Sequence, residues 1–291
     1  MKNINIFCFG FGQVAKNFIS KVNLEKYNIN FSSTSRNKTS LENFEGIEYN
    51  SYQFSNKKYD KNLILKLKEA DYILVSIPPK NEEDLVINNF SKILENSKAK
   101  WITYLSATSV YGDHKGEWVN ENSQTKPTSL NGIARLKAEN SWLSLEKNKN
   151  LPVQIFRLSG IYSNENNILV RLKLGNTKLI KKKNHFFSRI HVEDIASILF
   201  KSLFKFKAGE IYNLADDKPS SLEEVTLYAA KILNIKDLKN IEANEMESKM
   251  LISLYKDSKK VSNKKIKKYF NYNFKFPTYV EGLNYIRDNF I

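Results

Sequence analysis

Two glycines and an alanine stand near the start of the chain, in the stretch FCFGFGQVAKNF. Gly10, Gly12 and Ala15 follow an apolar run at residues 4–9 and open a segment with helical spacing. In this pattern the first glycine allows a tight turn, the second lets the backbone approach a pyrophosphate, and the small third residue lets helix and strand pack. The helix N-terminus then faces the phosphates. The pattern predicts a dinucleotide site, with a simple tight turn as the alternative.

The residues at the end of the second predicted strand indicate which cofactor binds. An acid at this place bonds the ribose hydroxyls of NAD, whereas a basic group accommodates the 2′-phosphate of NADP. This chain has Ser35, Arg36 and Lys38, and its next acid is Glu42. We therefore expect NADP in preference to NAD, with an ordinary exposed arginine as the alternative. The expected cofactor contacts are Gly10, Phe11, Gly12, Gln13, Val14, Ser35, Arg36, Ile77 and Pro78.

Apolar strand-like runs alternate with amphipathic helical segments along most of the chain. Continuously apolar strands separated by helices are typical of a parallel sheet covered on both faces. The expected fold is α/β, a doubly wound parallel sheet (Rossmann fold) with a small C-terminal α/β cap. Strands are predicted at residues 4–9, 29–35, 72–79, 101–108, 153–162 and 209–216. Helices are predicted from the glycine turn to about Val22, at 84–96, 129–143 and 191–203, and from a capping box of Ser220 and Glu223.

The same pattern predicts how the chain divides into domains. The nucleotide-binding domain is expected at residues 1–160 and is completed by about 186–215. The substrate-binding cap is expected at about 161–185 and 216–291, packed against the carboxyl ends of the sheet, where such folds bind ligands.

Composition excludes several classes of function. The chain has 291 residues, 41% of them hydrophobic and 26% charged, which is typical of a globular protein. No apolar run approaches the ~18–20 residues that span a bilayer. The single cysteine, Cys8, cannot form an internal disulfide, so we expect a cytoplasmic protein. The net charge is +15, but the lysines are scattered, which makes nucleic acid an unlikely partner.

Histidine and arginine positions add few further sites. Three histidines and one cysteine show no metal-ligand spacing, so no metal is expected. His191 stands before an acidic helix start and is expected to be structural, while His185 has no visible partner. Arg157, near the end of a predicted central strand, is a candidate anion ligand, with a salt bridge as the alternative.

Longer motifs follow one another along nearly the whole chain. They are YLSATSVYGDHKGEWVNE (104–121), FRLSGIYS (156–163), SRIHVEDIA (188–196), GEIYNLADDKPSSLEEV (209–225), and SNKKIKKYF with FPTYVEGL (262–283). Together they resemble the extended short-chain dehydrogenase/reductase superfamily, in its NAD(P)-dependent epimerase/dehydratase group. The short Gly-x-Gly-x-x-Ala turn departs from the usual Gly-x-x-Gly-x-x-Gly spacing of that group and indicates an atypical branch.

The resemblance implies a catalytic Ser or Thr, a proton-transferring Tyr, and a Lys four residues after it. The Ser/Thr position holds Ala107, although Ser106 and Thr108 flank it. Counted back from an Ala-Glu pair at 138–139, the Lys position holds Arg135 and the Tyr position holds Asn131. No tyrosine lies between residues 112 and 161, so a small shift of the alignment does not restore the usual acid.

These replacements change the chemistry that the family position can perform. Asparagine cannot donate and recover a proton as a phenol does, and arginine stays cationic. We expect Arg135 to hold the cofactor ribose, Thr108 to orient a substrate oxygen, and Tyr111 to stand in as the proton donor. The alternative for Tyr111 is a packing aromatic. His114 and Glu117 are weaker candidates, because polar loop residues are usually only solvated.

Two functions remain open at this point. One is an NADP-dependent oxidoreductase, epimerase or dehydratase that acts on a sugar nucleotide or another small carbonyl or alcohol. The other is a catalytically inactive NADP(H)-binding sensor or regulatory protein on the same fold. The resemblance implies a homodimer that pairs through the helix at 129–147, and no membrane partner is expected.

Overall fold

A computed structural model describes residues 3–56, 58–80, 82–175, 177, 179–238, 240–242, 252 and 255–291. They form two compact units. The first unit comprises Met1–Ala107, Ile133–Arg157 and Ile195–Tyr212; the second comprises Thr108–Gly132, Leu158–Asp194 and Asn213–Ile291. The division into a nucleotide-binding domain and a substrate-binding cap stays a prediction.

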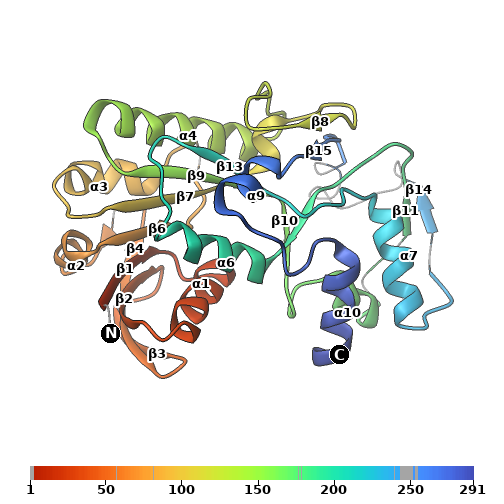
Figure 1. Cartoon of the computed structure of the whole chain (residues 1–291), viewed down its shortest axis with the longest axis horizontal. Coiled ribbons are helices and arrows are strands. Elements are labelled where there is room, and N and C mark those ends of the chain that lie inside the picture. Colours follow the sequence, from red (N-terminus) through yellow and green to blue (C-terminus); the bar gives the residue numbers. More distant parts are fainter. Residues whose placement is uncertain are drawn as a thin grey trace. The chain divides into compact units, whose positions relative to one another are not determined.

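The main sheet of the described chain has nine strands in the order β13-β9-β7-β6-β1-β2-β4-β3, with β5 paired to β4 (Figure 1). Strands β1, β2, β4, β6 and β7 pair in parallel. The order reverses at β1, as in doubly wound folds, which confirms the predicted Rossmann-type α/β class. The strands are β1 (Asn3–Phe9), β2 (Asn28–Ser35), β3 (Ser40–Phe44), β4 (Ile47–Ser55), β5 (Lys58–Tyr59), β6 (Tyr72–Val75), β7 (Trp101–Ala107), β9 (Val153–Leu158) and β13 (Ile211–Leu214).

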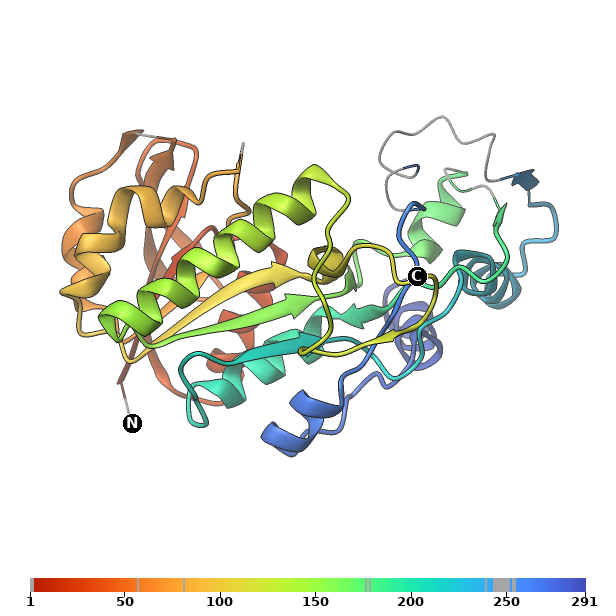
Figure 2. The same cartoon turned by 90° about the horizontal axis from the view of Figure 1, so that it is seen from above.

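Helices cover both faces of this sheet (Figures 1 and 2). Helices α2 (Leu63–Glu69), α3 (Leu85–Glu95) and α4 (Leu130–Lys149) share one apolar cluster with the strands, which contains Leu67, Phe90 and Trp142. On the other face lie α1 (Gln13–Leu24) and α6 (Val192–Ser202). There Phe18 stacks on Trp101, and the indole of Trp101 donates to the hydroxyl of Ser202 (3.0 Å).

The connection between β2 and β4 departs from the expected alternation of strand and helix. It contains β3, which runs antiparallel to β4 at the edge of the sheet. The turn between them is Glu45–Gly46, and both residues have positive φ (50° and 81°). This pair of angles belongs to the two-residue turns whose twist matches a hairpin. The sheet is therefore mostly parallel, with antiparallel pairing at this edge.

The second unit consists of small sheets and helices. Its strand pairs are β10 (Gly160–Tyr162) with β12 (Arg189–His191), β11 (Leu179–Lys181) with β14 (Asn240–Glu242), and β8 (Trp118–Val119) with β15 (Lys260–Val261). Its helices are η1 (Thr108–Tyr111), α5 (Ile168–Lys173), α7 (Leu222–Ile232), α9 (Lys264–Phe270) and α10 (Tyr279–Phe290). An apolar cluster with Leu169, Ala229 and Leu283 packs α5, α7 and α10 together. No helix among the described residues is long and apolar enough to cross a membrane.

Two predicted boundaries are wrong for local reasons. The run at 153–162 is not one strand, because Ser159 N–H donates to Leu214 whereas Gly160 N–H donates to Ser188. The cap of α7 is Ser221, whose hydroxyl accepts from Glu224 N–H (2.9 Å), and not Ser220. Ser220 is fully buried, and its backbone pairs with Phe187 instead.

His191 has the structural role expected for it. Its side chain is fully buried, and Nδ1 accepts from the N–H of Glu193 (3.3 Å) at the start of α6. The ring also contacts Tyr162 and Phe276, with centroids 5.0 and 4.1 Å away. Burial lowers the pKa of His191 from 6.5 to about 3, because the charged form loses its hydration.

This burial predicts a pH-dependent effect of His191→Gln. The unfolded chain binds more protons than the folded one between pH 3 and 6.5, so the stability that neutral His191 contributes is present above pH 6.5 and is lost as pH falls. The substitution should therefore cost more unfolding free energy at pH 7.5 than at pH 5, by on the order of 2 kcal/mol. Urea unfolding at both pH values measures the difference. An equal cost at the two pH values would contradict the prediction.

Candidate functional site

The glycine turn is held by hydrogen bonds from two neighbouring strands. Gly10 N–H donates to Oγ1 of Thr34 (2.9 Å), which lies on β2. The hydroxyl of Ser76, just past β6, donates to the carbonyls of Phe9 (2.9 Å) and Gly10 (3.2 Å). The turn is thus fixed where β1 lies between β2 and β6, at the point where the strand order reverses.

The two glycines of the turn have different constraints. Gly10 has φ +85°, and a Cβ on it would lie 2.9 Å from Oγ of Ser76. Its conformation and its neighbour both require glycine. Gly12 has φ −87°, which any residue adopts, and a Cβ on it would meet nothing within 4 Å. The fold therefore needs Gly10, whereas the absence of a side chain at Gly12 keeps a space open above the turn.

A pair of substitutions tests this difference. Gly10→Ala should lower the unfolding free energy by about 1–3 kcal/mol, because it adds backbone strain and a clash with Ser76. Gly12→Ala should change it by less than about 0.5 kcal/mol, because it adds neither. Thermal and urea unfolding of the two variants measure both values. Equal losses for the two variants would show that the turn does not have the described geometry.

The residues at the start of α1 fit a bound pyrophosphate. Gly12 is the N-cap of this helix and supplies no side-chain acceptor, so the first N–H groups are left for another acceptor. The side-chain Nε2 of Gln13 is buried and has no hydrogen-bond partner in the described part of the chain. Val14 is buried against the sheet, and Phe11 packs on Phe31 (ring centroids 5.3 Å apart), so both offer only their backbone to a ligand.

The other predicted cofactor residues lie at the ends of β2 and β6. Ser35 is the last residue of β2, and Arg36 follows it with an exposed side chain. None of the described residues forms a hydrogen bond or ion pair with the Arg36 guanidinium. Ile77 is half-buried, and its N atom would lie 3.6 Å from a Cβ on Gly10; Pro78 is exposed. All of these residues belong to the first unit.

Helix α4 carries the two residues at the family's Tyr and Lys positions. Asn131 is exposed and belongs to the second unit, whereas Arg135 is half-buried in the first. The guanidinium of Arg135 donates to the carbonyl of Leu105 (2.5 Å), near the end of β7. This bond ties α4 to the sheet and uses one of the five N–H groups of Arg135. The role of Arg135 toward a ribose stays a prediction.

Thr108 and Tyr111 stand at the two ends of the short helix η1 in the second unit. Tyr111 is fully buried, and its hydroxyl donates to Oδ1 of Asn213 (2.7 Å). Thr108 is half-buried, and its hydroxyl forms no bond with the residues that the structure describes. His114 bonds the carbonyls of Tyr111 and Gln124 (both 3.1 Å), which gives it a loop-bracing role. The catalytic roles of Thr108 and Tyr111 stay predictions.

The structure gives Arg157 and His185 definite partners. Arg157 forms a buried bidentate ion pair with Glu139 of α4, with Nη2 2.7 Å from Oε2 and Nε 3.0 Å from Oε1. Of the two interpretations of Arg157, the structure therefore supports the salt bridge, because its guanidinium already holds a carboxylate. His185 stacks on Tyr255 (ring centroids 4.8 Å apart) and contacts its carbonyl (3.1 Å), so it does have a partner. Within the described chain, no three His, Cys, Asp or Glu side chains gather to hold a metal.

Sequence reasoning missed Thr34 and Ser76, the two hydroxyls that fix the glycine turn. Both are small polar residues at the ends of apolar strands, and that position is the only signal that indicates them. Their partners are known only once β2 and β6 are placed beside β1.

Comparison of the sequence with protein-family models and with curated proteins found no match. Among solved structures, a functionally unknown conserved protein from Silicibacter pomeroyi DSS is 29% identical, with a TM-score of 0.86 over 99% of both chains. The dTDP-glucose 4,6-dehydratase from Bacillus anthracis, in complex with NAD, is 18% identical, with a TM-score of 0.76 over 99% of this chain and 97% of that one. The UDP-glucuronic acid 4-epimerase from Bacillus cereus, in complex with NAD, is 14% identical, with a TM-score of 0.76 over the same shares. The chain therefore has the Rossmann-type α/β fold of these sugar-nucleotide dehydratase and epimerase structures.

Proposed function

We propose that this protein is an atypical short-chain dehydrogenase/reductase that binds a nicotinamide dinucleotide at the glycine turn. The observation that carries the proposal is the contrast between Gly10, which the fold requires, and Gly12, which faces open space. An open glycine, an N-terminus of α1 without a side-chain cap, and the unpaired Nε2 of Gln13 together provide donors and room for a pyrophosphate. The NAD carried by structures with this fold supports the same cofactor class.

The preferred cofactor is NADP. Arg36 follows β2 directly, is exposed, and has no bonding partner within the described residues. A free guanidinium at the end of β2 suits the 2′-phosphate of NADP, and no acid stands there for the ribose hydroxyls of NAD. NAD in the compared structures belongs to chains that are at most 18% identical to this one, and these show the fold alone.

Titration of NADPH and NADH tests the cofactor site. We expect NADPH to bind more tightly, and Arg36→Ala to weaken NADPH by about tenfold or more, because charge-assisted bonds to the 2′-phosphate are lost. NADH binding should change little. Lys92→Ala, which removes a positive charge from exposed α3 surface, is the matched control. Gly12→Val should weaken both cofactors, and unchanged binding in that variant would refute the site.

The proposed reaction is an oxidation, epimerisation or dehydration of a sugar nucleotide. When bound, the nicotinamide supplies hydride transfer. Tyr111 is the proposed proton-transfer residue, because its phenol is already oriented by Asn213. The hydroxyl of Thr108, which lacks a partner among the described residues, is the proposed orienting group for a substrate oxygen.

The reaction is tested with dTDP-glucose, UDP-glucuronic acid and UDP-N-acetylglucosamine, followed by nicotinamide absorbance and product analysis. With a substrate that turns over, Tyr111→Phe should lower kcat by about 10²-fold or more and leave the NADPH affinity unchanged, because only the proton donor is removed. Asn213→Ala should lower kcat less, because the phenol stays but loses its orientation. Unchanged kcat in Tyr111→Phe would leave Tyr111 as a packing residue.

A second function is favoured by α4. The helix carries Asn131 where the family has its tyrosine, and the Arg135 guanidinium bonds the backbone of Leu105. Both observations suit a protein that binds NADP(H) without turning it over, as a sensor or regulator. NADPH binding without reaction on any sugar nucleotide would favour this alternative over the enzyme. Pairing of two chains through the 129–147 helix stays a prediction.

A further inference from the structure

An aromatic cluster lies on the surface of the first unit, where the C-terminal ends of α1 and α6 meet (Figure 1). The rings of Tyr27, Phe200 and Phe204 contact one another, with centroids 5.3, 5.7 and 5.8 Å apart. Tyr27 and Phe200 are half-buried, whereas Phe204 is 51% exposed. The cluster is therefore a packed aromatic platform whose outermost ring faces solvent.

The spacing along the two helices explains how separate segments form one surface. Phe200 and Phe204 are four residues apart, and the N–H of Phe204 donates to the carbonyl of Lys201 (3.2 Å), which continues the turn beyond α6. On α1, Lys21 and Leu24 are three residues apart and share a face. The Nζ of Lys21 lies 5.9 Å from the centroid of the Phe200 ring. Leu24, which is 76% exposed, therefore lies on the side of α1 that contacts the cluster.

Lysines surround this cluster. Residues 20–28 and 200–210 contain five lysines and two glutamates, which gives these two segments a net charge of +3. Both glutamates, Glu25 and Glu210, already form ion pairs with lysines of the same segments. We call Leu24, Tyr27, Phe200 and Phe204, together with Lys21, Lys26, Lys201, Lys205 and Lys207, the basic aromatic patch.

The type of cation indicates which anions fit the basic aromatic patch. All five basic residues are lysines, and neither segment contains an arginine. Arginine is the residue that holds individual carboxylates, because its guanidinium donates two parallel hydrogen bonds, whereas lysine is a compact charge on a flexible stem. Lysines near an anionic lipid surface are attracted by its diffuse negative potential and need no defined bonding geometry. The composition therefore favours a lipid surface over an acidic segment of a protein.

The exposed apolar side chains of the patch favour the same partner. Leucine and phenylalanine side chains flanked by lysines enter the boundary between headgroups and acyl chains, while the ammonium groups stay at the headgroups. A second copy of the patch would instead bring lysines against lysines, which is unfavourable. The net charge of +15 on the whole chain adds long-range attraction to an anionic surface.

We propose that the basic aromatic patch binds the surface of an anionic lipid bilayer, with Leu24 and Phe204 inserted among the headgroups. Attachment of this kind needs no spanning helix. The sequence-based expectation of no membrane partner considers long apolar runs, whereas this patch joins two short segments more than 170 positions apart. The proposal goes beyond the proposed function and does not depend on the cofactor site.

Flotation of the full chain with lipid vesicles tests the proposal. The probes are vesicles of phosphatidylcholine alone and of phosphatidylcholine with about 30% phosphatidylserine. We expect at least about fivefold more protein to float with the anionic vesicles. Phe204→Ser and Leu24→Ser should each lower that amount at least about threefold, because one apolar side chain no longer enters the bilayer. Equal flotation with the two kinds of vesicle would overturn the proposal.

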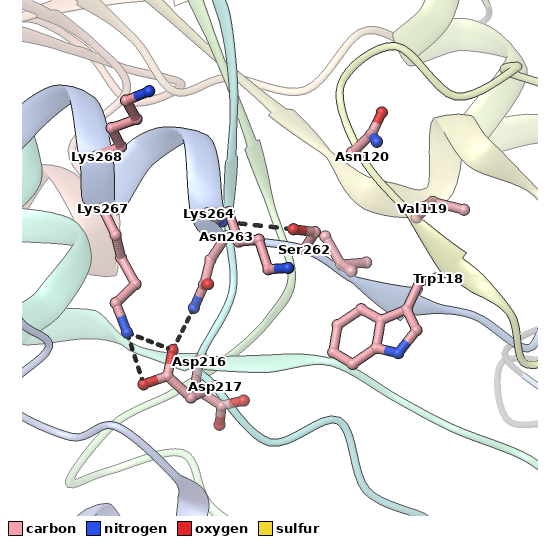
Figure 3. Close-up of a pocket in the computed structure, with 11 residues that line it drawn as sticks. Trp118, Val119, Asn120, Asp216, Asp217, Ser262, Asn263, Lys264, Lys267 and Lys268 are labelled. Carbon is pink, nitrogen blue, oxygen red and sulfur yellow. Dashed lines mark hydrogen bonds and ion pairs between the residues drawn. The ribbon is translucent and has the colours of Figure 1, made fainter.

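A pair of double variants separates the patch from the total charge. Lys201→Glu/Lys205→Glu should lower binding to the anionic vesicles at least about tenfold. The matched control is Lys264→Glu/Lys268→Glu, which changes two exposed lysines with the same spacing on α9. Those lysines line a cavity of about 800 Å³ in the second unit and are not part of the patch (Figure 3). The control should lose at least about threefold less binding, and equal losses would overturn the proposal, because net charge alone would then explain binding.

The variant Phe204→Trp measures insertion directly and keeps the test open if Phe204→Ser fails to fold. Its fluorescence, taken as the difference from the wild-type protein, should shift to shorter wavelength with anionic vesicles, because the indole leaves water. Binding without this shift would overturn the insertion of Phe204. Soluble polyglutamate that binds as tightly as the anionic vesicles would assign the patch to an acidic protein segment and overturn the lipid proposal.

Discussion

The first unit depends on the close approach of two strand ends, where the backbone of Gly10 passes the hydroxyl of Ser76. The hydroxyl of Ser76 donates to the carbonyl of Phe9, the last residue of β1, and to that of Gly10, and the N–H of Gly10 donates to Thr34 on β2. Three strands are thereby fixed at the place where the strand order reverses. These bonds satisfy the N–H of Gly10 and the carbonyls of Phe9 and Gly10, whereas the first N–H groups of α1 remain available to a ligand.

Helix α4 is tied to the sheet by two guanidinium groups. Arg135 of this helix donates to the backbone of β7. Glu139 of the same helix accepts from Arg157 of β9. Loss of one partner from a buried ion pair strongly destabilises a protein, because the other charge stays buried without compensation. Glu139 and Arg157 therefore depend on each other. Helix α4 is therefore anchored by guanidinium groups that stay charged at any physiological pH.

The sequence predicted β1, β2, β6, β7, β9 and β13 and the helices beside them, because these elements have continuous apolar runs or helical spacing, but it missed β3, β4, β5 and α2. It located the glycine turn because glycines at this spacing directly follow an apolar run. It failed where residues distant in the sequence decide which strand or side chain a residue contacts. Ser159 and Gly160 are adjacent, but their N–H groups belong to different strand partners, and no periodicity records this. The sequence left Arg157 open between an anion ligand and a salt bridge, and only the placement of Glu139 beside it decides between them.

Nothing in the sequence pattern indicated a cavity in the second unit. Trp118, Asp217 and Lys264 lie in three separate stretches, and only the pairing of β8 with β15 and the tie from Asn263 bring them together. Helix α9 buries Ile266 and Phe270 and leaves Lys264 and Lys268 exposed.

The β3–β4 hairpin has a consequence for the order in which the sheet assembles. Its register runs from Ser40 opposite Ser51 to Phe44 opposite Ile47, so every contact closes a loop of only a few residues. Such loops cost little entropy, and hairpins of this kind form in about 1–10 μs. The pairing of β6 with β1 joins residues more than sixty positions apart and must wait for a far longer loop to close. The hairpin stands where a crossover helix is expected. It gives the sheet a pair of strands at one edge that can form before the long-range parallel pairings.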